Sequence, residues 1–281
     1  MVVQHNMTAM NANRQLGVTT SSQAKVTEKL SSGYKINRAA DDAAGLTISE
    51  KMRSQIRGLT QASTNAQDGV SCVQTAEGAL AEVHSMLQRM NELAVKSANG
   101  TNTSADRTAI QKEIKALVCE IDRVKESTQF NTLSLLNGTF SEGAKITVQV
   151  GAANKAEQRI QIQIDNIATS KLGGTGDAAL KKVDLSTLSG ARKAIASITK
   201  SIAKISDIRS ALGAVQNRLE HTIANLDNIV ENTTAAESEI RDTDMAATMV
   251  EYSKNNILAQ AGQSMLAQAN TATQGVLSLL Q

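Results

Sequence analysis

Apolar residues recur every three or four positions through most of the chain, which is the spacing of helices that pack lengthwise against one another. Between residues 68 and 98 this seam consists of Val73, Ala76, Leu80, Val83, Leu87, Met90 and Ala94. Between residues 189 and 236 it consists of Ala191, Ile198, Ile205, Leu212, Leu219 and Leu226, flanked by Ile195, Ile202, Ile223 and Val230. A helix of the second length would span roughly 70 Å.

Two shorter stretches carry the same pattern. One face of a helix is formed by Ala44, Ile48, Met52, Ile56 and Leu59, and another by Ile110, Ile114, Leu117, Ile121 and Val124. Before the first, Gly33 can end an earlier helix and Asp41 or Asp42 can cap the new one. Before the second lies a short turn over residues 99–104, in which Thr103 or Ser104 can cap. So short a turn predicts an antiparallel helical hairpin.

One interval reads as β-structure. Apolar and polar residues alternate at Ile146, Val148 and Val150 and again at Ile160, Ile162 and Ile164. Residues 151–158 lie between the two runs, so a β-hairpin with a long loop is expected. The following segment, residues 170–177, is rich in Gly and is expected to be a flexible connector.

Composition supports a thin helical core. The 281 residues include no Pro, no Trp, two Phe and two Tyr, although 41% are hydrophobic. Without aromatic bulk the core must be aliphatic, and without Pro no helix is broken from within. A net charge of +2 argues against nucleic acid as the main partner. The sequence has neither a membrane-spanning run nor the apolar core of a secretory signal.

Catalytic and metal-binding motifs are absent from the sequence. His5, His84 and His221 are scattered, so neither a metal site nor a cofactor site is expected, and an enzyme is not expected. Cys72 and Cys119 are expected to be buried small hydrophobes. In the predicted hairpin they would lie ~20 Å apart, too far for a disulfide.

The terminal segments, about residues 1–40 and 242–281, carry apolar residues at helical spacing but are too weak to form a core alone. They are expected to be disordered in a free chain and to become ordered against other chains, which predicts self-assembly. The residues expected to be buried by polymerisation are Leu30, Met245, Met249, Met265, Leu277, Leu279 and Leu280.

Both ends of the chain resemble the bacterial flagellins. The N-terminal part contains KLSSGYKIN (29–37), DDAAG (41–45), GLTQASTNAQDG (58–69) and LQRMNELAVKSANGT (87–101). The C-terminal part contains LGAVQNRL (212–219), IRDTDMA (240–246), QAGQSMLAQAN (260–270) and VLSLL (276–280). Two features depart from the family: Gln281 at the end, and the presence of cysteines.

The resemblance implies a mainly α fold, a long antiparallel bundle with a small β-hairpin region and paired terminal helices. It implies a filament-core domain of residues 1–43 and 242–281, and a bundle domain of residues 44–241. The hairpin lies near 146–164, and the family's variable outer domain is reduced to a short region near 170–190. It further implies an extracellular flagellar filament used for motility, export without a cleaved signal peptide, and an export chaperone and cap or junction proteins as partners.

The resemblance also implies recognition by the host's Toll-like receptor 5. By position in the motifs, Arg89, Leu93 and Glu113 stand where the family contacts this receptor. Arg89 lies just outside the Leu87/Met90 seam, which agrees with an exposed charge. Two other functions stay open: an adaptor at the junction of hook and filament, and an intracellular coiled-coil scaffold.

Overall fold

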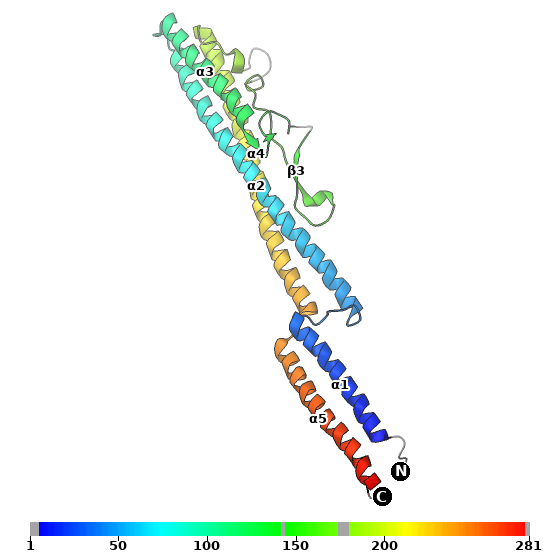
Figure 1. The fold of residues 1–281 in the computed structure, drawn as a ribbon. Coiled ribbons are helices and arrows are strands. Elements are labelled where there is room, and N and C mark those ends of the chain that lie inside the picture. The colour runs from blue at the N-terminus through cyan, green and yellow to red at the C-terminus, as the bar shows by residue number, and fades with distance from the viewer. Residues whose placement is uncertain (1–5, 142–143, 174–179, 279–281) are drawn as a thin grey trace. The chain divides into compact units, whose positions relative to one another are not determined.

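The computed structural model describes residues 6–141, 144–173 and 180–278, with side chains as far as residue 272. Helices dominate the described part (Figure 1): α1 (Met7–Ser32), α2 (Ala43–Ser97), α3 (Ser104–Ser127), α4 (Leu188–Arg241) and α5 (Met245–Ser278). This confirms the predicted mainly α fold. The two predicted helical stretches at 44–59 and 68–98 are joined in the single helix α2. Contacts divide the chain into two compact units, residues 1–56 with 231–281 and residues 57–230.

The larger unit is a bundle of α3 with the parts of α2 and α4 that belong to it. The predicted seams form its core, since Leu80, Leu87, Ile121, Ile198 and Ile205 are all completely buried. The aliphatic side chains of the three helices pack into one continuous cluster. A fully buried Leu or Ile contributes about 1.5–3 kcal/mol relative to an exposed one. Many such positions along one seam therefore stabilise the bundle without aromatic residues.

The turn between α2 and α3 follows the predicted capping. Thr103 is the N-cap of α3, and its hydroxyl accepts a hydrogen bond from the Asp106 amide while the Asp106 carboxylate accepts from the Thr103 amide. At the start of α2, the Asp42 carboxylate accepts from the Gly45 amide at 2.9 Å. Asp41 instead accepts from the amides of Asn37 and Arg38. The cap predicted at Asp41 or Asp42 is therefore at Asp42.

The predicted hairpin is present, and its strands are shorter than the alternating runs in the sequence. Strands β3 (Ile146–Gln149) and β4 (Arg159–Ile162) are antiparallel, and Ile146 and Val148 face Ile162 and Ile160. A 3₁₀ turn, η1 (Ala156–Gln158), lies in their connection. The hairpin packs closely on the helices at Gly69 of α2, where an added Cβ would lie 3.2 Å from Val148 and 3.3 Å from Leu219 of α4.

A second, very short hairpin escapes the sequence pattern. Strands β1 (Gln129–Phe130) and β2 (Leu133–Ser134) are joined by Asn131 and Thr132. Both connecting residues have positive φ, 45° and 66°, which is uncommon outside Gly. Two-residue strands are too short for alternation to be detected, which is why the sequence did not predict them.

The chain between the hairpin and α4 is fixed to the bundle by hydrogen bonds. Thr169 donates to the Asp122 carboxylate through its amide (3.2 Å) and its hydroxyl (2.8 Å). Gln111 of α3 donates to the Val183 carbonyl and accepts from the Leu185 amide. A 3₁₀ turn, η3 (Leu180–Lys182), precedes this contact. Of the predicted flexible connector, residues 170–173 are described and residues 174–177 lie outside the described residues.

The smaller unit contains α1 and α5, which run antiparallel side by side (Figure 1). At one end, the Asn6 side chain donates to the Ala269 carbonyl at 2.8 Å. At the other, the Thr243 amide donates to the carbonyl of Gly33, the left-handed residue that ends α1. The pairing of the N- and C-terminal helices is therefore confirmed.

Candidate assembly and recognition surfaces

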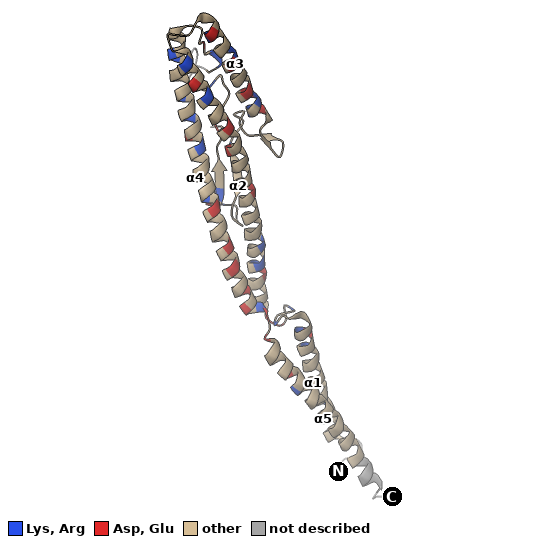
Figure 2. Ribbon diagram, turned by 90° about the vertical axis from the view of Figure 1, so that its left-hand side faces the viewer, with Lys and Arg blue, Asp and Glu red and all other residues tan. Residues whose placement is uncertain are grey.

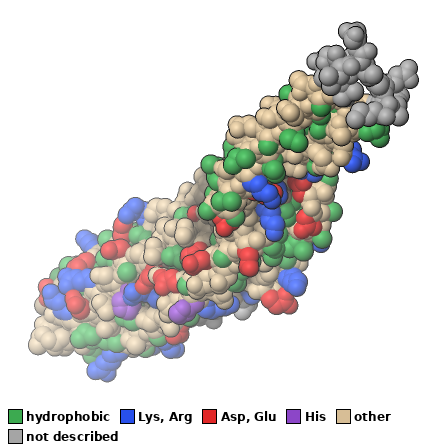
Figure 3. Space-filling model, turned by 90° about the horizontal axis from the view of Figure 1, so that it is seen from below, with side chains coloured by type: hydrophobic (Ala, Val, Ile, Leu, Met, Phe, Trp, Pro, Cys, Tyr) green, Lys and Arg blue, Asp and Glu red, His purple; other side chains and the backbone are tan. Residues whose placement is uncertain are grey.

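The paired terminal helices leave most of their apolar side chains exposed. In α1 the single buried residue is Val26, and in α5 the buried hydrophobic residue among those described is Ala259. Figure 3 shows hydrophobic side chains spread among polar ones over this surface. The exposed large hydrophobic residues of the unit are Met7, Met10, Val18, Ile48, Met245, Met249, Val250, Ile257, Leu258 and Met265. A two-helix pair of this kind cannot bury its own apolar area.

The predicted polymerisation residues fall into three groups. Met245, Met249 and Met265 are 48%, 51% and 64% exposed. Leu30 is half-buried near the end of α1. Leu277 lies in α5 beyond the described side chains, and Leu279 and Leu280 lie outside the described residues. The three methionines are thus exposed on α5, together with other large apolar residues that the sequence analysis did not single out.

Arg89 and Glu113 form an ion pair between α2 and α3. The Nε and Nη2 atoms of Arg89 donate to Glu113 Oε1 at 3.2 and 3.0 Å, while Nη1 donates to Glu92 at 3.1 Å. The hydrogen bonds to Glu92 and Glu113 raise the pKa of Arg89 above its usual value. Both Arg89 and Glu113 remain about half exposed. The sequence analysis did not single out Glu92, although a spacing of three residues from Arg89 is typical of an ion pair along one helix.

Leu93 has a different position from its two predicted companions. It is 3% exposed and packs in the bundle core with Met90 and Ala94. In the folded chain its side chain is inside the bundle, so the exposed surface here consists of Arg89, Glu92 and Glu113.

The two cysteines differ from each other. Cys72 is buried, as predicted, and burial raises the pKa of its thiol. Cys119 is exposed, so the prediction that it is buried is wrong. It lies on the face of α3 opposite Ile114 and Ile121, the seam residues. Both thiols are free.

The described part of the chain holds no cluster of three or more His, Cys, Asp or Glu side chains that could ligate a metal ion. Among its helices, none combines the length and apolar character that a membrane crossing requires.

Comparison with known protein families shows the family to which the chain belongs. The family model described as the bacterial flagellin N-terminal helical region matches residues 3–141. The model described as the bacterial flagellin C-terminal helical region matches residues 195–280. The chain belongs to the bacterial flagellin family. It is a structural protein of that family, as the resemblance of its terminal motifs implied.

Two relatives extend the match over the whole chain. A flagellin of Halalkalibacterium halodurans is 52% identical over 281 residues, covering 100% of both chains. A protein of Treponema maltophilum, the flagellar filament 31.3 kDa core protein, is 49% identical over 288 residues, again covering 100% of both. Both relatives are about as short as this chain, which agrees with the absence of a large outer domain.

A solved structure shares the fold at greater sequence distance. It is described as a flagellar hook-associated protein from Vibrio parahaemolyticus, and it is 15% identical with a TM-score of 0.60. The match covers 72% of this chain and 100% of that one. The likeness therefore shows a shared helical fold.

Proposed function

We propose that the chain is the subunit of an extracellular flagellar filament that serves motility. The family and the filament relatives support this proposal, and the exposed apolar surface of α1 and α5 is the structural observation that carries it. A single copy leaves this surface exposed, so the free energy that its burial would supply is not gained within one copy. Each Met, Leu or Ile that becomes fully buried would contribute about 1.5–3 kcal/mol, so packing of these helices between copies would stabilise a polymer.

Removal of residues 242–281 tests this mechanism. The truncated chain should remain soluble and largely helical by circular dichroism, because the seams of α2, α3 and α4 are retained. It should form no filaments in negative-stain electron microscopy, since α1 has then lost its partner α5. Normal filaments from the truncated chain would contradict the mechanism.

A point-substitution series gives a finer test. Met249→Gln with Met265→Gln should raise the critical concentration for polymerisation at least tenfold. Val95→Gln with Leu133→Gln is the matched control, since these residues are 55% and 47% exposed in the larger unit. The control should polymerise like the unchanged chain. Equal critical concentrations for the unchanged chain and both double variants would show that α5 takes no part in the contact between copies.

Export and assembly factors complete the proposal. The chain would leave the cell without a cleaved signal peptide, assisted by an export chaperone and by cap and junction proteins. Mass spectrometry of secreted protein checks this, because the N-terminal segment should be intact apart from removal of Met1. Loss of a longer N-terminal segment would contradict it.

A second proposed role is as a ligand of Toll-like receptor 5. The ion pair of Arg89 and Glu113 presents an exposed, ordered charge at the position expected from the resemblance. Arg89→Ala with Glu113→Ala should weaken receptor binding while polymerisation is unchanged. Leu93→Ala is expected to lower bundle stability instead, because Leu93 is in the core. Unchanged receptor affinity in the double variant would show that the site was misplaced.

The junction adaptor remains the alternative that the shared fold favours. The adaptor and the filament subunit differ in polymerisation: an adaptor should not form long filaments from purified protein. Electron microscopy of the purified chain therefore distinguishes them. An intracellular scaffold would instead be retained in cells. Detection of the chain in culture medium would therefore contradict the scaffold function.

A further inference from the structure

Asn255 of α5 is almost fully buried, and its side-chain amide lacks a partner. The residue is 7% exposed, and its Nδ2 atom donates no hydrogen bond to any described residue. Four other described side chains contain a buried nitrogen or oxygen without a partner, but these residues are all partly exposed: His84, Asn91, Arg209 and Arg241. Burying an amide without replacing its bonds to water is unfavourable. Asn255 therefore lowers stability where an apolar residue would raise it.

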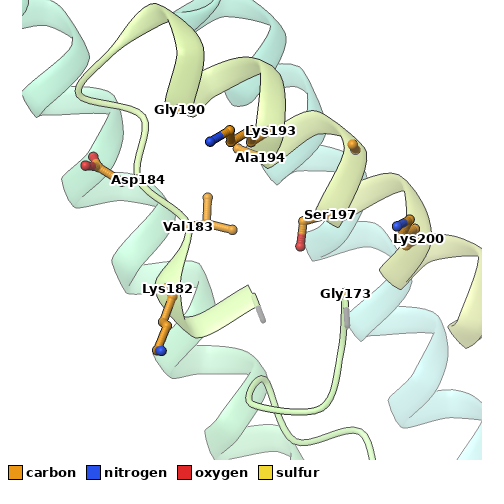
Figure 4. A pocket seen from close by; sticks show the side chains of 10 residues that line it. Gly173, Lys182, Val183, Asp184, Gly190, Lys193, Ala194, Ser197 and Lys200 are labelled. Atoms are coloured by element: carbon orange, nitrogen blue, oxygen red, sulfur yellow. The ribbon is translucent and has the colours of Figure 1, made fainter. Parts of the chain in front are cut away.

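The cavity beside the first turns of α4 contains no comparable group among its described lining residues. Its volume is about 370 Å³ (Figure 4). Lys193 and Lys200 line it and are exposed to solvent, so water can satisfy their charges. Ser201, buried one turn beyond Ser197 on the same helix, donates its hydroxyl to the Ser197 carbonyl at 2.9 Å. Asn255 thus differs from the polar side chains around this cavity.

The facing sides of α1 and α5 follow a seven-residue repeat. In each helix, buried or half-buried positions recur alternately three and four residues apart, which is the spacing of a coiled-coil seam. The positions in α1 are Ala9, Ala12, Leu16, Thr19, Gln23, Val26 and Leu30. Those in α5 are Thr248, Tyr252, Asn255, Ala259, Gly262, Leu266 and Ala269. Many of these residues are Ala, Gly or Thr, whose small side chains distinguish weakly between one register and another.

The register of the two seams places Gln23 at the level of Asn255. Leu16 lies opposite Gly262, because a Cβ added at residue 262 would be 3.3 Å from Leu16 Cδ1 and 3.8 Å from Leu16 Cβ. The helices are antiparallel, so one heptad forward in α1 and one heptad back in α5 lead from this pair to Gln23 and Asn255. Both have side-chain amides, which can donate and accept hydrogen bonds.

Charge does not set this register. Figure 2 shows few charged residues along α1 and α5, and no ion pair joins the two helices within the described part of the chain. Hydrogen bonds at the two ends of the pair, from Thr243 to Gly33 and from Asn6 to Ala269, are accepted by backbone carbonyls. Every residue supplies such a carbonyl, so these bonds discriminate poorly between registers.

A slip of one heptad shows what the polar residues would prevent. It would bring Ala9 to the level of Gly262, so a small residue would still face a small one. It would also bring Asn255 to the level of Leu16, where the buried amide would face an aliphatic side chain. In the observed register the same amide faces Gln23 instead.

We propose that Gln23 and Asn255 form a polar layer that fixes the register of the α1–α5 pair. The Asn255 amide donates to the side chain of Gln23 in this layer, and a slip breaks that bond. One polar layer within a helical seam specifies register at a cost in stability. The inference goes beyond the proposed function, because it concerns contacts within one copy.

Two engineered disulfides report the register, each in a chain that also carries Cys72→Ala and Cys119→Ser. Leu16→Cys with Gly262→Cys reports the observed register, because a Cβ–Cβ distance of 3.8 Å suits a disulfide. Ala9→Cys with Gly262→Cys reports the slipped register, since these residues are otherwise ~10 Å apart along the pair. Exchange with glutathione gives the effective concentration of each thiol pair, and gel mobility without reductant separates links within one copy from links between copies.

Asn255→Leu is the decisive variant. Without it, the 16–262 link should form and the 9–262 link should be nearly absent. With it, the effective concentration of the 9–262 pair should rise at least tenfold, because a leucine at residue 255 packs well against Leu16 in the slipped register. The melting temperature should not fall, since the variant removes an unpaired buried amide. A side chain with a purely structural role would instead lower the melting temperature and leave the register unchanged.

Two further variants serve as controls. Gln23→Asn with Asn255→Gln exchanges the two amides and should keep the observed register, because a polar layer is retained. Thr19→Leu makes an apolar change in the neighbouring layer of the same seam and should also keep it. Both should therefore give the 16–262 link and little of the 9–262 link.

Three results would overturn the inference. The first is an Asn255→Leu variant that forms only the 16–262 link, since the bonds at the two ends would then fix the register alone. The second is equal slipping in either control, which would show that any change in the seam loosens the pair. The third is absence of both links, in unassembled copies and in sedimented filaments alike. Failure to form filaments would contradict the proposed function but would leave the links in unassembled copies as a separate measurement.

Discussion

The guanidinium carbon of Arg241 lies 4.6 Å from the centre of the Tyr34 ring. Arg53 approaches the same ring at 5.9 Å and also pairs with Glu237 at 3.2 Å. The backbone joins the same place, because the Lys35 amide donates to the Arg241 carbonyl at 2.7 Å. The connection between α1 and α2 is thus attached to the connection between α4 and α5.

Substitution of Tyr34 tests the importance of this attachment. Tyr34→Ala should lower the free energy of unfolding by ~1–2 kcal/mol, because it removes the aromatic face that both arginines contact. Tyr34→Phe keeps the face and should stay within ~0.5 kcal/mol of the unchanged chain. Urea denaturation followed by circular dichroism measures both. Equal losses for Ala and Phe would show that the hydroxyl, not the ring, is responsible.

The capping box of α3 predicts an acid-sensitive helix end. Hydrogen bonds from Thr103, first from its hydroxyl and then from its amide, lower the pKa of Asp106. Because the folded pKa is depressed, the stabilisation is present above the ordinary carboxyl range and is lost as pH falls through the folded pKa. NMR titration of Asp106 should show a pKa below 3.8. In Thr103→Val the pKa should rise toward that value, and an unchanged pKa would argue against the capping box.

The aliphatic seam should dominate stability. Leu87→Ala removes a completely buried side chain and should destabilise the bundle by ~2–5 kcal/mol. Val95→Ala is a nearby control on the same helix, 55% exposed, and should change stability by less than ~0.5 kcal/mol. Thermal unfolding of the two variants gives the comparison. Similar melting temperatures would mean that this part of the seam is not packed.

Thiol labelling should separate the two cysteines. Cys119 is exposed, whereas Cys72 is buried with a raised thiol pKa. Because the thiolate is the reactive form, maleimide at neutral pH should label Cys119 quickly and Cys72 only in denaturant. The single variants Cys72→Ala and Cys119→Ser assign the two rates. Fast labelling of Cys119→Ser in the folded state would contradict the burial of Cys72.

The sequence alone determined the helical architecture. Heptad spacing identifies every helix of the bundle, since a seam such as Leu80, Leu87 and Ala94 depends on local periodicity alone. Caps at Gly33, Asp42 and Thr103 follow from local hydrogen bonding and were also predictable. The β3–β4 pairing is visible because alternation extends over enough residues to be recognised. Family membership follows from the motifs at both ends.

Tertiary structure decided which side chains meet across elements. The ring of Tyr34 and the guanidinium of Arg241 are far apart in sequence, and no periodicity relates them. Leu93 and Arg89 have similar places in one motif, yet packing buries the first and exposes the second. Local patterns fix conformation, whereas contacts and exposure depend on the packing of distant elements.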